Sequence, residues 1–139
     1  MEIKTLERDG AVIAVVNSPD VLIRDVQSAL DLFMSVRYEA GSSRIALNKE
    51  AVTEEFFVLS TRLAGEVLQK FVNYQTKLAL FGDFSHYTSK PLRDFIYESN
   101  QGSDVFFVSD EAEAVDRLAR AGADAADRRP ALKNFSETA

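Results

Sequence analysis

The stretch Arg44–Val108, RIALNKEAVTEEFFVLSTRLAGEVLQKFVNYQTKLALFGDFSHYTSKPLRDFIYESNQGSDVFFV, decides the fold of this 139-residue chain. It contains three short apolar runs, Ile45–Leu47, Leu78–Phe81 and Val105–Val108, separated by two stretches with apolar residues at helical spacing. Strands that alternate with helices predict a β-α-β-α-β unit with a parallel sheet. Ligands and partners of such a sheet meet the carboxyl ends of its strands, so the residues after each strand are the first site candidates.

The residues before this stretch predict an antiparallel hairpin followed by a helix. Two β-favouring runs, Ile3–Leu6 and Ala11–Val16, flank an Asp-Gly step at residues 9 and 10, which is a strong hairpin signal. Ser18 as N-cap and Pro19 at the first helical position predict the start of the helix. The whole order is then a hairpin followed by α-β-α-β-α-β-α, which predicts a single α/β domain with a mixed sheet.

The later helices have their own start signals. Thr53 followed by two glutamates predicts the start of the second helix, and Pro91 predicts the start of the third. Asp110 and Glu113 have capping-box spacing before the last helix. Residues 1–122 are therefore predicted to form the domain, and the polar, aperiodic residues 123–139 are predicted to be a disordered tail.

The composition excludes several classes of function. The chain has 16 Lys and Arg against 22 Asp and Glu, and a net charge of -6 opposes generic binding to nucleic acid. It contains no cysteine and one histidine, so disulfides, thiolate catalysis, and cysteine-based or histidine-rich zinc sites are excluded. No cofactor motif is present, and no apolar run approaches the length of a membrane span. We therefore expect a cytoplasmic protein that binds neither nucleic acid nor membrane.

Polar and aromatic residues at the strand ends are the candidates for a binding rim. The three strand ends carry Asn48-Lys49-Glu50, Gly82-Asp83-Phe84-Ser85 and Ser109-Asp110. The candidate rim itself comprises Asn48, Lys49, Glu50, Asp83, Phe84, Ser85, His86, Tyr87 and Lys90.

A structural role is the more common alternative for each of these residue types. Asn48 and Asp83 would then bond backbone in turns, Lys49 and Lys90 would be solvated, and His86 would be an exposed loop residue. A magnesium site built on Glu50, Glu54 and Asp83 is a further alternative, although their spacing matches no known motif.

Four aromatic residues are predicted to project outward and to mark a partner or dimer surface if they cluster. They are Phe57, Phe84, Tyr87 and Tyr97.

The chain resembles a bacterial family known only as a domain of unknown function, number 4180, over most of Ser28–Leu118. The segments Leu47–Glu50, Gly82–Ser85 and Phe95–Asn100 carry the resemblance. The family brings no assigned activity, substrate or catalytic residue. The predicted element order also resembles the STAS fold of sulphate-transporter tails and anti-sigma-factor antagonists.

The antagonists carry an Asp-Ser-Ser-Gly stretch at a helix start, where one serine is phosphorylated. The nearest counterpart is Leu59-Ser60-Thr61-Arg62, which keeps two hydroxyls, lacks the aspartate and the glycine, and is predicted to lie inside the second helix. Ser60 and Thr61 are thus the candidates for a phosphorylation switch that the resemblance implies.

These observations favour a small regulatory or protein-interaction module, with a protein partner or self-association, because no complete catalytic motif is present. The alternative is a small-ligand binder or enzyme with a polar site at the carboxyl ends of the strands. A concavity of about 300 Å³ or more around converging polar side chains would favour the alternative.

Overall fold

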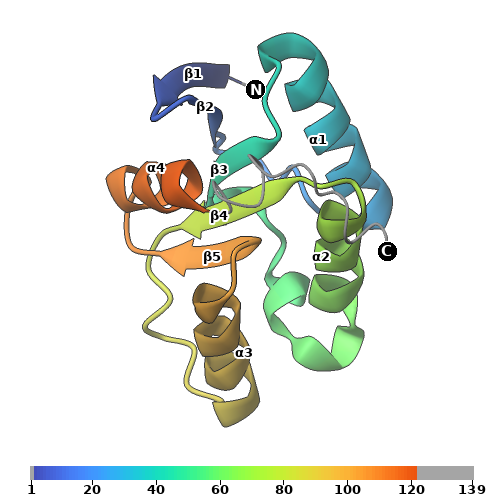
Figure 1. Ribbon diagram of the computed structural model, residues 1–139. Helices are drawn as coiled ribbons and strands as arrows, with labels where there is room; N and C mark the ends of the chain where they lie inside the picture. The colour runs from blue at the N-terminus through green and yellow to red at the C-terminus, as the bar shows by residue number, and fades with distance from the viewer. Residues whose placement is uncertain (1, 122–139) are drawn as a thin grey trace.

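The computed structural model describes residues 2–121 as a five-stranded sheet with helices on both faces (Figure 1). The predicted tail, residues 123–139, lies outside the described residues. The strands are β1 (Glu2–Arg8), β2 (Ala11–Asn17), β3 (Arg44–Asn48), β4 (Lys77–Phe81) and β5 (Val105–Val108). The helices are α1 (Val26–Ala40), α2 (Leu63–Asn73), α3 (Lys90–Gln101) and α4 (Glu111–Arg120), with short 3-10 turns η1 (Lys49–Ala51), η2 (Glu54–Phe57) and η3 (Leu59–Thr61).

The strands follow one another across the sheet in the order β1-β2-β3-β4-β5. β1 pairs with β2 in an antiparallel hairpin, and β2 to β5 are parallel. The hairpin turn consists of Asp9 and Gly10, both with positive φ (55° and 83°), as a two-residue turn of this kind requires. The predicted α/β fold, with an N-terminal hairpin followed by α-β-α-β-α-β-α, is confirmed.

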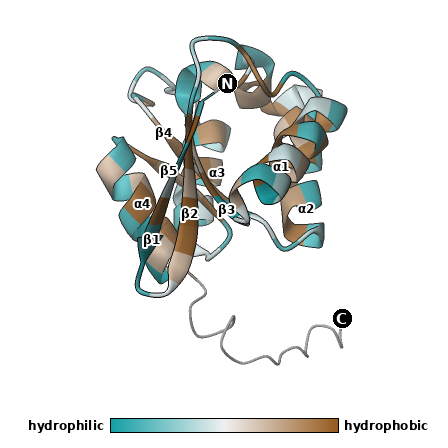
Figure 2. Ribbon diagram, turned by 90° about the horizontal axis from the view of Figure 1, so that it is seen from above, coloured by the Kyte–Doolittle hydropathy of each residue, from teal (hydrophilic) through white to brown (hydrophobic). Residues whose placement is uncertain are grey.

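The two faces of the sheet are covered unequally. Each crossover from β2 to β5 steps one strand in the same direction, and crossovers of one hand then place their helices on one face. Accordingly α1, α2 and α3 share one core with alternate strand residues such as Leu47 and Leu80. Among the described helices, α4 is the one that packs on the opposite face, against residues such as Ala46 and Phe106. Figure 2 shows the strands between α4 on one side and α1 and α2 on the other.

The first helix begins later than predicted. Ser18 is not its N-cap, because the Ser18 amide donates to the Asn48 side chain and the Ser18 hydroxyl donates to the Asp20 carbonyl. The helix begins after Asp25, which forms a reciprocal capping box with Ser28. Long-range pairing of residue 18 with β3 thus overrides the local start signal.

The second helix also begins later than predicted. Residues 49–61 form the three 3-10 turns, and α2 starts at Leu63 after Arg62, which has a left-handed φ of 68°. Phe56 and Phe57 are both buried in the same core and pack edge to face on each other at 5.1 Å, within the irregular backbone between Thr53 and Arg62. Ser60 and Thr61 therefore precede α2, and the prediction that they lie inside the helix is wrong.

Candidate functional site

Asn48, at the end of β3, is buried and faces the end of β2. Its Oδ1 accepts a hydrogen bond from the Ser18 amide at 2.8 Å, and its Nδ2 donates to the Ser18 carbonyl at 2.7 Å. Both residues are almost inaccessible to solvent. Asn48 therefore pairs with a peptide group as a neighbouring strand would, and its side chain fixes the end of β2.

Lys49, Glu54, Phe57 and Tyr87 form a compact group beside this pair, which we call the rim cluster. The Lys49 Nζ lies 5.6 Å from the centre of the Phe57 ring and 5.2 Å from that of Tyr87, and it bonds a Glu54 carboxylate oxygen at 3.2 Å. The Tyr87 hydroxyl donates to the other Glu54 oxygen at 2.8 Å, and the Phe57 and Tyr87 rings stack at 4.8 Å. The alternative in which Lys49 is solvated is wrong, because its side chain is only 12% exposed.

The electrostatics of the rim cluster keep its ions charged. Burial alone lowers the pKa of Lys49, but the Tyr87 hydroxyl and the Glu54 carboxylate outweigh it and raise the pKa above its usual value. Burial likewise opposes ionisation of Glu54, whereas Tyr87 and Lys49 bring the pKa of that carboxyl below its usual value. Burial raises the pKa of Tyr87. A lysine that holds its proton this firmly is neither a nucleophile nor a general base at neutral pH.

The remaining rim candidates after β4 are arranged locally. Asp83 accepts hydrogen bonds from the Ser85 amide (2.9 Å) and the Ser85 hydroxyl (2.6 Å), and these bonds lower the pKa of the carboxyl. The exposed His86 ring lies 4.1 Å from the Tyr87 ring. Lys90 is exposed and bonds Asp94 one turn along α3. The structural alternative thus describes Asp83 and Lys90 well.

Glu50 is exposed, and within the part of the chain that the structure describes it does not join Glu54 and Asp83 in a metal-binding group. The Glu50 carboxylate receives a single long bond of 3.3 Å from the Asn48 amide. Within residues 2–121 no group of three or more acidic or histidine side chains is placed to hold a metal ion, so Glu50, Glu54 and Asp83 do not make such a set.

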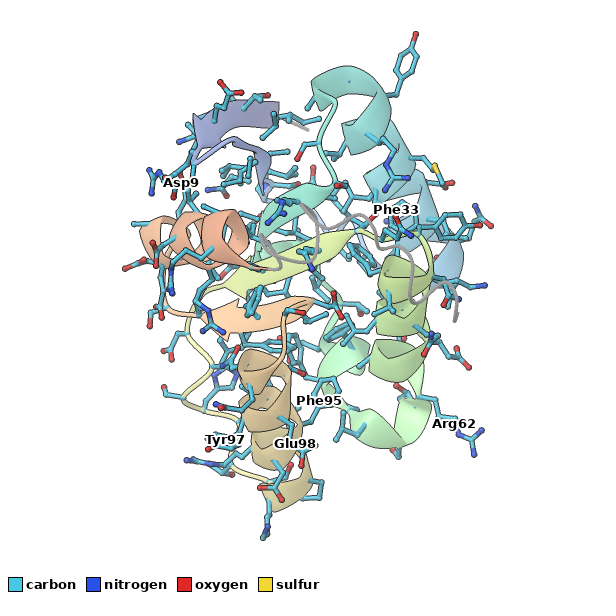
Figure 3. All side chains as sticks on the ribbon, viewed as in Figure 1. Asp9, Phe33, Arg62, Phe95, Tyr97 and Glu98 are labelled. Atoms are coloured by element: carbon cyan, nitrogen blue, oxygen red, sulfur yellow. The ribbon has the colours of Figure 1, made fainter. Side chains whose placement is uncertain are left out.

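The aromatic candidates separate into two groups. Phe57 is buried, so its predicted outward projection is wrong, and the half-buried Phe84 and Tyr87 pack against it. Tyr97 lies on α3 and is 65% exposed (Figure 3), and among the described residues it shares no ring contact with Phe57, Phe84 or Tyr87. The predicted outward-facing aromatic patch is therefore replaced by an inward-facing stack.

The two phosphorylation candidates lie in η3. Ser60 is exposed. The Thr61 hydroxyl donates to the carbonyls of Glu55 and Val58.

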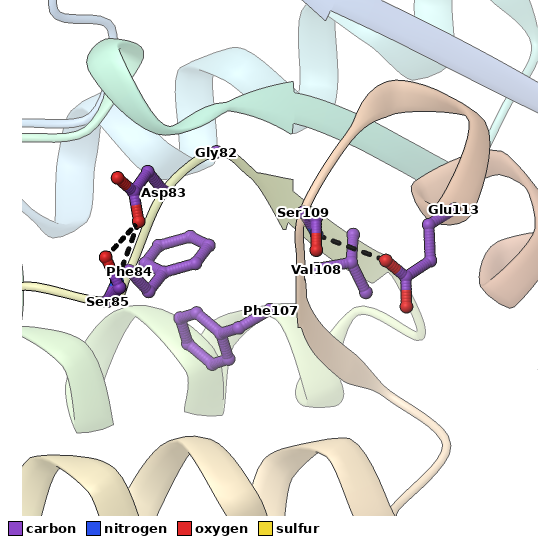
Figure 4. Close-up of a pocket in the computed structure, with 8 residues that line it drawn as sticks. All are labelled: Gly82, Asp83, Phe84, Ser85, Phe107, Val108, Ser109 and Glu113. Atoms are coloured by element: carbon purple, nitrogen blue, oxygen red, sulfur yellow. Dashed lines mark hydrogen bonds between the residues drawn. The ribbon is translucent and has the colours of Figure 1, made fainter.

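An open crevice of about 480 Å³ lies between the carboxyl ends of β4 and β5 (Figure 4). Its position follows from the topology. Among the described strands, β4 and β5 are the only parallel neighbours whose following helices, α3 and α4, pack on opposite faces. Connections that diverge in this way leave a gap at the edge of a sheet, where ligands of α/β proteins bind. The lining residues are Gly82, Asp83, Phe84, Ser85, Phe107, Val108, Ser109 and Glu113.

The crevice combines an apolar floor with polar walls. Phe84 and Phe107 pack edge to face at 5.6 Å, and Asp83 and Glu113 bring carboxylates from opposite walls. Glu113 is positioned by the Ser109 amide, which donates to its Oε1 at 3.2 Å. None of the lining residues is a cation.

Sequence reasoning found one wall of the crevice and missed the other. The sequence predicts Asp83, Phe84 and Ser85 as rim residues, but it indicates Ser109 only as a strand end and Glu113 only as a capping residue. Glu113 joins the crevice because the connections after β4 and β5 lead to opposite faces of the sheet. That arrangement is known only once the sheet topology is known.

Comparison with known proteins identifies the family of the chain. The chain belongs to the family described as Domain of unknown function (DUF4180), whose model matches residues 8–118. No curated protein and no solved structure matches the chain. The resemblance to STAS domains therefore stays a prediction. No helix within residues 2–121 combines the length and apolar character that crossing a membrane requires.

Proposed function

We propose that this chain is a small-ligand-binding module whose site is the crevice between β4 and β5. One observation carries the proposal: a concavity of about 480 Å³ lies where two neighbouring parallel strands send their connections to opposite faces. This volume falls within the range of about 300–1,000 Å³ that is typical of small-molecule sites. An apolar floor with a few converging polar groups is also typical of such sites.

The lining chemistry favours a small polar molecule that offers hydrogen-bond donors. Asp83 is ionised at neutral pH because its pKa is lowered, and it keeps one carboxylate oxygen outside its bonds to Ser85. Ammonium and hydroxyl groups are the natural partners of such oxygens, whereas an anion would meet two carboxylates and no cation. The apolar part of the ligand would lie on Phe84 and Phe107.

Binding rather than catalysis is the activity that these groups support. The Ser85 hydroxyl donates to a carboxylate of lowered pKa, which is a weak base. Among the described residues, His86 contacts the Tyr87 ring and makes no hydrogen bond to a serine. An oriented nucleophile-base pair is therefore not assembled at the crevice.

A titration followed by amide NMR tests the proposal. The probes are primary amines and polyols, with matched carboxylic acids as negative controls. We expect amines or polyols to shift the resonances of residues 82–85 and 107–109. Asp83→Asn should weaken that binding about tenfold or more, the cost of losing a charge-assisted bond.

The matched control is Glu39→Gln, which removes the same charge from an exposed position near the end of α1. This control should bind as the wild type does. Three results would refute the proposal: resonance shifts that map to other residues, no binding by any probe, or an affinity of Asp83→Asn equal to that of the wild type.

A protein-interaction module remains the second candidate, and a separate surface favours it. Met34 (42% exposed) and Tyr38 (90% exposed) lie one turn apart on α1, and Tyr74 (43% exposed) packs on the neighbouring Phe33. Large exposed side chains of this kind are often found at partner surfaces. Capture from the native host with the wild type and with Met34→Ser/Tyr38→Ser tests this candidate. A partner retained equally by both chains would count against this surface.

A further inference from the structure

The two edges of the sheet differ in whether their backbone groups are satisfied. On the outer side of β5, the Asn100 side chain of α3 accepts from the Phe107 amide (2.7 Å) and donates to the Phe107 carbonyl (3.1 Å). At Phe107 the Asn100 side chain thus takes the place of a neighbouring strand. β1, at the other edge, pairs only with β2, and no described element lies beyond it (Figure 1).

The hairpin register identifies which groups of β1 point outward. Arg8 and Ala11 flank the two-residue turn and therefore form a hydrogen-bonded pair. Because inward and outward groups alternate along an antiparallel strand, the amides and carbonyls of Ile3, Thr5 and Glu7 face away from β2. Such a row of unpaired groups is a template for another strand.

We propose that the β1 edge binds a second copy of this chain, with β1 antiparallel to its counterpart and Thr5 opposite Thr5. In this register Thr5 pairs with itself and Ile3 pairs with Glu7, so every outward-facing group of β1 finds a partner. The resulting dimer has a continuous sheet across a two-fold axis. This surface is separate from the crevice, so the inference is independent of the proposed ligand.

The charges of β1 select this register over its neighbours. With Thr5 opposite Thr5, Glu2 of each copy lies opposite Arg8 of the other, which gives two complementary pairs. Centring the contact on Lys4 would place Lys4, which is paired with Glu111 of α4, against its own copy. Centring it on Leu6 would place Lys4 against Arg8. Like charges directly opposite destabilise a strand pair, and each shifted register also leaves outward groups unpaired. The charged side chains thus favour the register with Thr5 opposite Thr5 over the two shifted registers.

Cysteine cross-linking tests the register, because the chain has no cysteine of its own. Residues opposite each other in a hydrogen-bonded antiparallel pair have Cα atoms about 5.5 Å apart, within disulfide range. Thr5→Cys should therefore form a covalent dimer under mild oxidation. Glu7→Cys is the matched control, since the two copies of residue 7 would lie four residues apart, or about 13 Å. The control should stay uncross-linked.

Sedimentation equilibrium on the unmodified full chain supplies the second measurement. We expect a mass that rises toward the dimer with concentration. Glu2→Arg or Arg8→Glu alone should weaken dimerisation roughly tenfold, and the double exchange should restore it to within about threefold. Thermal unfolding of each variant shows that the hairpin is intact.

Three results would overturn the inference. They are a wild-type mass that stays monomeric up to about millimolar concentration, cross-linking of Glu7→Cys equal to that of Thr5→Cys, and a double exchange no better than either single variant.

Discussion

Asn48 is a candidate binding residue by sequence and a structural residue by geometry, and its substitution separates the two roles. Its amide makes bonds of 2.8 and 2.7 Å to the peptide groups of Ser18, and both residues are buried. Asn48→Ala leaves a buried N–H and a buried C=O without partners. Each such loss costs about 1–3 kcal/mol, so we expect the free energy of unfolding to fall by about 2–6 kcal/mol. Urea denaturation with constant m-value is the assay.

A second substitution at the same position adds a pH signature. Asn48→Asp keeps an acceptor for the Ser18 amide but places an oxygen against the Ser18 carbonyl, so its carboxyl should have a raised pKa in the folded state. A carboxyl whose pKa is higher in the folded than in the unfolded state destabilises the fold increasingly as pH rises above its unfolded pKa of about 3.9. The deficit against the wild type should therefore be smallest near pH 4 and largest near pH 7.

The control for both variants is Asn73→Ala, at an exposed position where the side chain bonds only Gln69. It should stay within about 0.5 kcal/mol of the wild type. A loss below about 1 kcal/mol for Asn48→Ala, or a deficit for Asn48→Asp that ignores pH, would refute the reasoning.

The other predictions concern two glycines and the rim cluster. Gly82→Ala should destabilise by about 1–3 kcal/mol, because an added Cβ would lie 2.8 Å from the Cβ of Lys49. Gly65→Ala should stabilise the protein by up to about 1 kcal/mol, because the new methyl group in α2 meets open space. Chemical denaturation that gives the same change in unfolding free energy for both glycine variants would contradict this contrast. Glu54→Gln should cost roughly 0.5 kcal/mol at pH 7, since the Glu54 carboxylate is largely exposed. Because the pKa of Glu54 is lowered in the fold, this cost should vanish as pH falls below about 4, and a denaturation series with unchanged cost at pH 3 would exclude the pairing with Lys49.

The strands and their order along the chain could be predicted because their signals are local. The Asp9-Gly10 turn and the apolar runs of β3, β4 and β5 are each sufficient to specify a strand or turn. The starts of α1 and α2 could not be predicted in this way. In the first case the Ser18 amide is engaged by β3, and in the second the burial of Phe57 competes with a regular helix. Both competing contacts join residues that are close in the fold but distant in the sequence, such as Ser18 with Asn48 and Phe57 with Tyr87, so local patterns do not reveal them.

Only the part of the candidate site that comes from a single segment, the connection after β4, could be predicted from the sequence. The run after β4 stands out because a connection of this length, rich in polar and aromatic residues, is unusual. Glu54 joins the same region from η2, and its partner Tyr87 is distant in sequence, at 2.8 Å in space. Glu113 belongs to the crevice because α4 packs on the opposite face from α3. Neither the Glu54–Tyr87 bond nor the place of Glu113 in the crevice produces a pattern of residue spacing that a single sequence would reveal.

The rim cluster and the crevice are physically connected through Phe84. This side chain lines the crevice and also packs against Phe57 at 5.9 Å and Phe107 at 5.6 Å. Tyr87, stacked on Phe57 and bonded to Glu54, holds the other end of the connection after β4. The crevice wall is thus attached to the hydrophobic core at both ends, and a preorganised wall reduces the conformational entropy lost on binding.

Tyr87 variants test this connection, because the ring and the hydroxyl can be removed separately. Tyr87→Phe keeps the stacked ring and removes the hydroxyl, with its exposed bond to Glu54 and its interaction with Lys49. Ligand affinity at the crevice should then stay within about twofold of the wild type. Tyr87→Ala removes the ring and should weaken the same binding by about fivefold or more, although residue 87 does not line the crevice. The NMR titration measures both affinities. Equal affinities for the two variants would show that the wall keeps its shape without the stack.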